Sequence, residues 1–322
     1  MEHLMAIEGI DAITYGTDQW DNARKFLTDW GLKELQYSNT EQRFETLNGS
    51  QVCVCAMDDA SLPQAIEAGP TLREVTWGVD SDADLTRISH ALRSAPGFAA
   101  SAECVQALDP HGLSIVFQRS AKRAVQVQGA LTNPYGNTQR VDTPSPVYER
   151  ATPVEIGHVV LFTDRLAQAV SFYESLGFVV SDSYPNRGVF LRCAATAGHH
   201  DLFLLQVPGK AMGLNHVAFT VRDIHEVFGG GLAMGRAGWK TQLGPGRHPV
   251  SSAYFWYFDN PCGGLIEYNA DEDHLTPAWQ AREFTPGPTV FAEWAVDGGI
   301  DGHTRRQANA NNTGAFLTDK RP

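Results

Sequence analysis

The sequence lacks several features that would assign it to a particular class of protein. It has only five cysteines in 322 residues, and no two of them form a C-x-x-C pair, so neither a disulfide framework nor a zinc ribbon is indicated. It has no uncharged apolar run close to the ~20 residues that span a bilayer. Its N-terminus has no basic stretch followed by an apolar one, so no secretory signal is expected. We therefore expect reduced thiols, a cytoplasmic location and no membrane partner.

Positive charge is also scarce. The 25 Lys and Arg residues are outnumbered by 37 Asp and Glu residues, which gives a formal net charge of −12. Such an acidic protein is not expected to bind nucleic acid or an anionic membrane, because both are themselves negative. The rest of the composition is that of a globular protein: 43% of the residues are hydrophobic, and the length suits two domains.

What the chain does contain is an internal repeat. Residues 10–32 align without a gap on residues 156–178, and each copy has the pattern of a strand followed by an amphipathic helix. In this alignment Asp18 matches Asp164, and both are predicted to cap the N-terminus of their helix.

A weaker repeat joins residues 72–84 to residues 214–226, again as a strand followed by a helix. Short apolar runs separated by turns follow each of the four helices. The repeating unit is therefore one strand, one helix and about three strands, a βαβββ module that occurs four times. This pattern predicts an α+β fold in which the modules pair into two domains.

The predicted domain boundaries follow from the repeat and from composition. The first two modules fill residues 1–120 as an N-terminal domain, and the last two fill residues 153–270 as a catalytic domain. The segment 121–152 is rich in Pro, Gly and Asn and is predicted to be a linker. Residues 271–322 form a C-terminal tail that is expected to dock on the body first and to be mobile from Gly302 onward.

Three residues of the second half have the types and the placement of a metal site. Two histidines and one glutamate fall within different predicted strands: His158 in residues 155–162, His216 in residues 214–220 and Glu267 in residues 264–268. One histidine on a strand is more often a packed residue than a ligand. Two imidazoles and a carboxylate on separate strands, however, form the facial triad that binds Fe(II) and leaves other coordination positions open.

The first half provides an internal control for this hypothesis. In the repeat alignment the three positions correspond to Ala12, Glu74 and Val116. One carboxylate with an alanine and a valine cannot hold a metal, although the same module is predicted there. The fold therefore does not itself require His, His and Glu, which favours a chemical role for them. We expect one metal site per chain and none in residues 1–120.

Three motifs extend the metal set: GHHDLFLL at residues 198–205, GPGRHPVSSAYFWY at residues 244–257 and NPCGGLIEY at residues 260–268. With the four modules, they resemble the type I extradiol catechol dioxygenases of the vicinal oxygen chelate (glyoxalase/bleomycin resistance/dioxygenase) superfamily, most of all the 2,3-dihydroxybiphenyl 1,2-dioxygenases. The resemblance covers most of the chain and is strongest over residues 153–270. It implies two vicinal-oxygen-chelate domains, each a half-open β-barrel with outer helices.

The resemblance also implies an activity. Both atoms of O2 would enter a catechol-type aromatic substrate, giving a hydroxymuconic semialdehyde-type product in the catabolism of aromatic compounds. Fe(II) is the expected metal, with Mn(II) as the alternative, and a homo-oligomer is expected.

Individual residues receive roles from the same resemblance. His200 would be the acid–base residue, with His199 as the alternative, because an imidazole titrates near neutrality. His248 and Tyr257 would hydrogen-bond the substrate oxygens. His199 is expected to be a solvated neighbour of His200. Four further histidines are expected to be structural: His90, His111, His225 and His274.

Three other functions are open at this point. A glyoxalase-type metalloenzyme could use the same fold, but such sites usually have four protein ligands, and no second carboxylate stands out in the sequence. An enzyme like 4-hydroxyphenylpyruvate dioxygenase would use the same triad with a 2-oxo acid and would leave His248 and Tyr257 without their roles. A non-catalytic binding protein of the bleomycin-resistance kind would lack metal ligands, so His158, His216 and Glu267 count against it.

Overall fold

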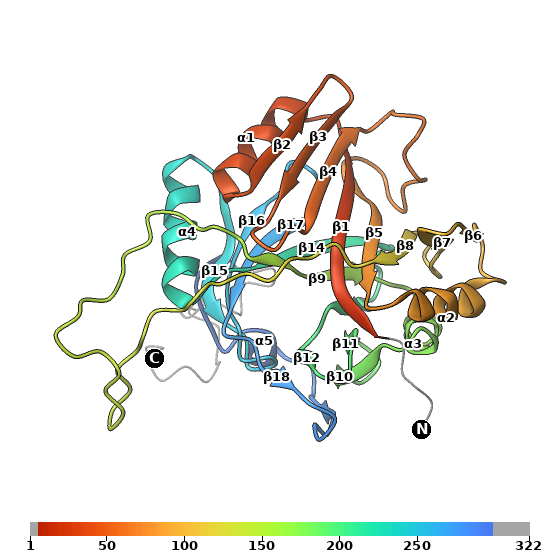
Figure 1. The fold of residues 1–322 in the computed structure, drawn as a ribbon. Helices are drawn as coiled ribbons and strands as arrows, with labels where there is room; N and C mark the ends of the chain where they lie inside the picture. Colours follow the sequence, from red (N-terminus) through yellow and green to blue (C-terminus); the bar gives the residue numbers. More distant parts are fainter. Residues whose placement is uncertain (1–5, 299–322) are drawn as a thin grey trace.

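The computed structural model describes residues 6–298 and shows two large β-sheets with few helices (Figure 1). The helices and strands follow one another in the order that four βαβββ modules require, which confirms the predicted α+β fold. No helix among the described residues is long and apolar enough to cross a membrane. All five cysteines are free thiols.

The first sheet is built from the first two modules. Its eight strands lie in the order β2-β3-β4-β1-β5-β8-β7-β6, so β1 and β5, the first strands of the two modules, are neighbours at its centre. The elements are β1 (Ile7–Thr17), α1 (Trp20–Trp30), β2 (Lys33–Tyr37), β3 (Glu41–Glu45), β4 (Gln51–Ala56), β5 (Thr71–Val79), α2 (Asp82–Leu92), β6 (Ala99–Ala100), β7 (Cys104–Leu108) and β8 (Ser114–Arg119).

The second sheet repeats that order strand for strand, as β10-β11-β13-β9-β14-β17-β16-β15. The strands β9, β14 and β17 therefore lie side by side at its centre. The elements are β9 (Glu155–Phe162), α3 (Leu166–Ser175), β10 (Val179–Tyr184), β11 (Gly188–Arg192), β12 (Ala197–Gly198), β13 (Leu202–Leu205), β14 (Gly213–Thr220), α4 (Ile224–Arg236), β15 (Thr241–Arg247), β16 (Tyr254–Asp259) and β17 (Leu265–Ala270).

The segment after β17 lengthens the second sheet and adds a small two-stranded sheet, in which β18 pairs with β12. It contributes β18 (His274–Leu275), β19 (Arg282–Glu283), α5 (Pro288–Phe291) and β20 (Trp294–Gly298). Strand β19 pairs with β10 and β20 pairs with β15, so the segment lengthens the sheet at both edges. The mobility expected from Gly302 onward concerns residues outside the described range.

Two of the predicted helix caps are wrong. Helix α1 begins after Gln19 and α3 after Arg165, and neither N-cap side chain makes a capping hydrogen bond. Asp18 and Asp164 each lie one residue too early for that role. The hydroxyl of the preceding threonine accepts a backbone N–H instead, Thr17 from Gln19 and Thr163 from Arg165, both at 3.0 Å.

Helix α1 packs on the back of the second sheet rather than on its own sheet alone. The Trp30 ring stacks on Tyr268 of β17 with centroids 3.5 Å apart, and the Tyr268 hydroxyl donates to the Trp30 carbonyl at 2.7 Å. Successive side chains of a strand point to opposite faces, so Glu267, the neighbour of Tyr268, points away from this helix. A single hydrophobic cluster connects the two sheets and fixes the orientation of β17.

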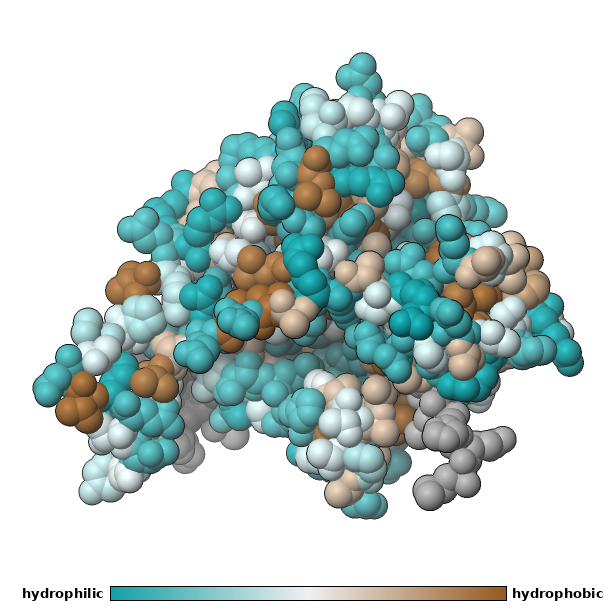
Figure 2. All heavy atoms as spheres, viewed as in Figure 1, coloured by the Kyte–Doolittle hydropathy of each residue, from teal (hydrophilic) through white to brown (hydrophobic). Residues whose placement is uncertain are grey.

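Residues 121–152 carry no helix or strand and run as an arm along and away from the sheets, at the lower left of Figure 1. Several apolar and aromatic side chains of this arm are exposed: Leu131, Tyr135, Val141 and Val147. Figure 2 shows hydrophobic patches in the same region of an otherwise largely hydrophilic face.

Candidate metal centre

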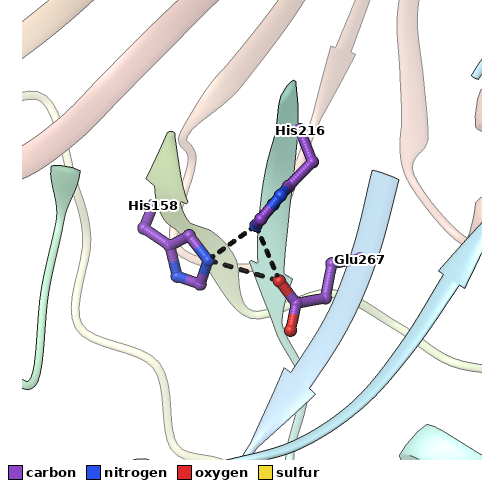
Figure 3. Close-up of side chains that lie close together, drawn as sticks. All are labelled: His158, His216 and Glu267. Atoms are coloured by element: carbon purple, nitrogen blue, oxygen red, sulfur yellow. Dashed lines mark hydrogen bonds and ion pairs between the residues drawn. The ribbon is translucent and has the colours of Figure 1, made fainter. Parts of the chain in front are cut away.

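The three predicted metal ligands come together on one face of the second sheet (Figure 3). They project from the neighbouring strands β9, β14 and β17. Ala218 is the cross-strand partner of both His158 and Glu267, and His216 lies two residues from Ala218 on the same face. The small Ala218 side chain leaves the space between the two flanking ligands free. The register of the three strands and the alternation of side chains along each strand thus bring all three side chains together on one face.

The distances fit a shared ion. The Nε2 atoms of His158 and His216 lie 3.2 Å apart, and they lie 3.2 and 3.1 Å from Oε2 of Glu267. Adjacent ligands of an octahedral ion with metal–ligand distances of about 2.1 Å are on the order of 3 Å apart. Three facing ligand atoms at this spacing can therefore coordinate one metal ion.

The Glu267 carboxylate supports the same interpretation. It is fully buried, and neither of its oxygens has a hydrogen-bond partner among the described residues, because the imidazole nitrogens approach it without the alignment of a hydrogen bond. A buried carboxylate that faces two imidazole nitrogens without an aligned hydrogen-bond donor is the kind of group that a cation satisfies.

The first sheet has the same register without the ligands. Thr76 pairs with both Ala12 and Val116, as Ala218 pairs with His158 and Glu267, and Glu74 lies two residues from Thr76, as His216 lies from Ala218. The strand pairing therefore matches Ala12, Glu74 and Val116 to the three ligand positions, as the alignment of the sequence repeat does. Glu74 is instead satisfied by the Ser114 hydroxyl, which donates to it at 2.8 Å.

A pocket opens in front of the triad. Five of the six residues predicted for the site line it, and the sixth, Glu267, lies beneath them in contact with the triad histidines. The rest of the wall is mostly apolar and aromatic: Val160, Tyr184, Phe190, Phe203, Leu205, Val250 and Phe291. The pocket therefore has one polar end and one apolar body.

His248 and Tyr257 form a hydrogen-bonded pair at the polar end. The Nδ1–H of His248 donates to the carbonyl of Phe291 at 2.7 Å, which leaves Nε2 to accept from the Tyr257 hydroxyl at 3.0 Å. Burial, followed by the nearby Glu267 charge, raises the pKa of Tyr257 well above its usual value. The phenol is therefore protonated at neutral pH and remains a donor.

Comparisons with known proteins agree with this geometry. Residues 155–268, which carry all six site residues, match the model of the Glyoxalase/Bleomycin resistance protein/Dioxygenase superfamily. This segment belongs to that superfamily. The chain is also 33% identical over 181 residues to Metapyrocatechase 2 of Cupriavidus necator, across 55% of this chain and 54% of that protein. The chain thus matches about half the length of this curated relative.

Solved structures show the same fold over nearly the whole chain. A Mn(II)-bound glyoxalase from Novosphingobium aromaticivorans has a TM-score of 0.72 at 23% identity, covering 97% of each chain. A catechol 2,3-dioxygenase has a TM-score of 0.68 at 16% identity, covering 92% of this chain and 97% of its own. The chain thus has the same fold as these two proteins, and at these identities the likeness concerns the fold alone.

His199 differs from the expectation. It was predicted to be solvated, and this is wrong, because its side chain is fully buried, with Nε2 2.9 Å from Oδ2 of Asp182 and Nδ1 3.2 Å from Nδ1 of His200. The reason is that β10 and β11 lie behind this segment, so a side chain pointing away from the pocket meets Asp182 and Phe190 rather than water. Burial lowers the pKa of His199.

The structure also adds a carboxylate that the sequence did not single out. Oε1 of Glu272 lies 2.9 Å from Nδ1 of His200, and His158, His200 and Glu272 form a second group that could hold a metal ion. Glu272 lies in the segment that follows β17, where no motif or periodicity pointed to it. His111, predicted to be structural, is buried between Asp109 and Thr163.

Proposed function

We propose that the protein is an Fe(II)-dependent extradiol dioxygenase that cleaves catechol-type aromatic rings. The observation that supports it most is the triad of His158, His216 and Glu267, with its unsatisfied buried carboxylate, at the polar end of an aromatic pocket. Bound iron would supply the electron path between the ring and O2 that their direct reaction lacks. The product would be a hydroxymuconic semialdehyde-type compound.

The remaining polar residues of the pocket have roles that follow from their positions. His200 is next to His158, with ring centroids 4.1 Å apart, and would take the proton of a catechol hydroxyl. When a substrate binds, the single hydroxyl hydrogen of Tyr257 would turn from Nε2 of His248 to a substrate oxygen. The aromatic and aliphatic walls would hold the ring and keep water from it.

The pocket wall favours a particular class of catechol. None of the described residues that line it is Lys or Arg, whereas seven are apolar or aromatic. A carboxylate on the substrate ring would be buried without a partner, which is strongly unfavourable. We therefore expect unsubstituted, alkyl-substituted or aryl-substituted catechols to be cleaved with a kcat/KM on the order of 100-fold higher than that of carboxylate-bearing catechols. Initial rates with a panel of matched catechols measure this ratio, and a preference for the acidic members would contradict it.

The function itself is tested by anaerobic loading followed by an assay. The protein is reconstituted with Fe(II) or Mn(II), mixed with catechol and O2, and followed by product absorbance and oxygen uptake. The proposal expects one O2 consumed per ring opened and no turnover by a His158→Ala variant. Turnover without O2 uptake, or equal activity in that variant, would exclude it.

We also expect one metal ion per chain, in the second sheet. The equivalent positions of the first sheet hold one carboxylate, Glu74, which Ser114 already satisfies. A Glu74→Gln variant should therefore keep the metal content of the unchanged protein and melt at a similar temperature. Elemental analysis after anaerobic purification gives the stoichiometry. Two ions per chain, or loss of metal in Glu74→Gln, would contradict a single centre.

A glyoxalase-type reaction is the second candidate, and the position of Glu272 is the observation that favours it. A four-ligand site needs a second carboxylate, and Glu272 lies 2.9 Å from His200 beside the triad. In that case Glu272→Ala would lose metal and the reaction would consume no O2. In the dioxygenase, the same variant would retain metal, because the triad is complete without Glu272.

We further propose that the protein forms a homo-oligomer. The exposed arm of residues 121–152, with Tyr135 and Val147 open to solvent, supports this proposal, since a second copy could cover these side chains. Sedimentation velocity of the full chain measures the assembly directly.

A further inference from the structure

A chain of buried polar groups extends from His200 away from the pocket. Nδ1 of His200 lies 3.2 Å from Nδ1 of His199, and Nε2 of His199 lies 2.9 Å from Oδ2 of Asp182. Asp182 in turn accepts hydrogen bonds from Arg282: the backbone N–H donates to Oδ1 at 2.7 Å, and the guanidinium donates to both oxygens, most closely to Oδ2 at 2.6 Å. Both histidines and Asp182 are buried, so water is not a competing partner.

The protonation state at the far end of this chain is well defined. Burial would raise the pKa of Asp182, but the hydrogen bonds from His199 and Arg282 lower it by more. Asp182 is therefore ionised at neutral pH, and an ionised carboxylate only accepts hydrogen bonds. Since Asp182 cannot donate, Nε2 of His199 must carry the hydrogen that joins them.

The position of the hydrogen on His199 also determines which nitrogen of His200 carries a hydrogen. Burial lowers the pKa of His199, so the ring is neutral and carries only one hydrogen. With the hydrogen on Nε2, the Nδ1 of His199 has a lone pair and can only accept. The bond between the two Nδ1 atoms therefore requires the hydrogen to lie on Nδ1 of His200. A neutral His200 then has its lone pair on Nε2.

We propose that Asp182 and His199 are positioning residues that set the tautomer of His200, so that its Nε2 accepts the proton of the bound catechol hydroxyl. In that step the O–H bond breaks, its electron pair stays on the oxygen, and the proton moves to Nε2, while Nδ1–H of His200 remains bonded to His199. The role in catalysis rests on the proposed dioxygenase function, whereas the tautomer does not.

Glu272 competes with His199 for Nδ1 of His200. Its Oε1 lies 2.9 Å from the same Nδ1 of His200, without the alignment of a hydrogen bond, and has no hydrogen-bond partner among residues 6–298. As an acceptor it would favour the same tautomer. As a protonated acid, which burial favours by raising its pKa, it would favour the opposite one. A Glu272→Ala variant separates the two influences.

The decisive variant is Asp182→Asn. The backbone N–H of Arg282 would still donate to an amide oxygen at the position of Oδ1, which places the amide NH2 at the position of Oδ2, facing Nε2 of His199. The partly exposed Arg282 guanidinium, whose 2.6 Å bond is to Oδ2, would then turn away from it. His199 must then accept at Nε2 and carry its hydrogen on Nδ1, and His200 must carry its hydrogen on Nε2. The change keeps the size of the side chain and its backbone hydrogen bond, releases the Arg282 guanidinium, and is expected to reverse both tautomers. We expect kcat to fall by about 100-fold or more, with a smaller change in KM and with unchanged metal content.

The tautomer is measured independently of turnover. Nitrogen-15 spectra of the full chain, labelled at histidine and free of metal, distinguish hydrogen on Nδ1 from hydrogen on Nε2 of His200. The inference expects Nδ1–H in the unchanged protein and in Glu272→Ala, and Nε2–H in Asp182→Asn. It is overturned if Asp182→Asn leaves the tautomer unchanged, or if Glu272→Ala alone reverses it.

A second pair of variants guards against a folding defect in Asp182→Asn. His199→Asn places an amide oxygen where Nδ1 of His199 accepts, whereas His199→Ala removes the acceptor. We expect the asparagine variant to retain most of the kcat that the alanine variant loses, with similar melting temperatures. Equal losses in both would overturn the positioning role. If the unchanged protein cleaves no catechol but the tautomers shift as expected, the proposed function fails and the tautomer assignment stands.

Discussion

Replacing Glu267 with alanine is expected to abolish metal binding and ring cleavage together. Glu267 supplies the only negative charge of the triad, and its oxygen lies 3.1–3.2 Å from both histidine nitrogens. Loss of residues that merely support a metal ligand weakens binding by 10–100-fold, so loss of a charged ligand should weaken it by at least about 100-fold. Elemental analysis and oxygen uptake on the same preparation measure both effects.

The matched control is Glu74→Gln, which removes a carboxylate at the position of the first sheet that corresponds to His216. It should leave metal content and turnover unchanged. Metal retained by Glu267→Ala at the level of the unchanged protein would show that the ion binds elsewhere. The group of His158, His200 and Glu272 would then be the first alternative.

Replacing His200 with alanine is expected to reduce turnover by about 10²–10⁴-fold, the range typical of a positioned acid–base group. Metal should be retained, because the triad does not include His200. KM for catechol should change less than kcat, since the proton is transferred in the chemical step rather than on binding. Steady-state kinetics at saturating O2, with the metal content of each preparation measured, give all three quantities.

His274→Ala is the control for this substitution. His274 is exposed on β18, which pairs with β12 just before His199 and His200, so the change is close to the site but touches neither its residues nor its pocket. It should be nearly silent. Metal loss in His200→Ala would indicate that the ion binds at the group that contains His200 and Glu272. A mild effect on kcat would instead indicate that His200 is not the proton-transfer residue, and His248 would be the next candidate.

The repeat and the clustering of His158, His216 and Glu267 could be predicted from the sequence because both depend on local patterns. Period-two alternation and the strand–helix order identify the four modules. The side-chain types at His158, His216 and Glu267 then stand out against the alanine, glutamate and valine of the other half. The strand pairing in the structure gives the same correspondence, because Ala218 in the second sheet and Thr76 in the first are the central cross-strand partners.

The helix N-caps were predicted only in part by the same reasoning. The local pattern correctly indicated a helix after each first strand, but Asp18 and Asp164 are not the capping residues, because a threonine hydroxyl already accepts the nearby backbone N–H. Both threonine and aspartate favour this position, so the sequence did not decide between them.

The sequence by itself therefore determined the fold, the position of the triad and the neighbours that face the pocket. Tertiary structure alone decided what lies behind His200. Asp182 is 17 residues from His199 and 100 residues from Arg282 along the chain. The pairing of β10 with β19 at the edge of the second sheet brings Asp182 to Arg282, and the path of the chain between β12 and β13 places His199 against Asp182. The residue types of Asp182, Glu272 and Arg282 are those of ordinary surface positions, and only burial gives their charges a consequence.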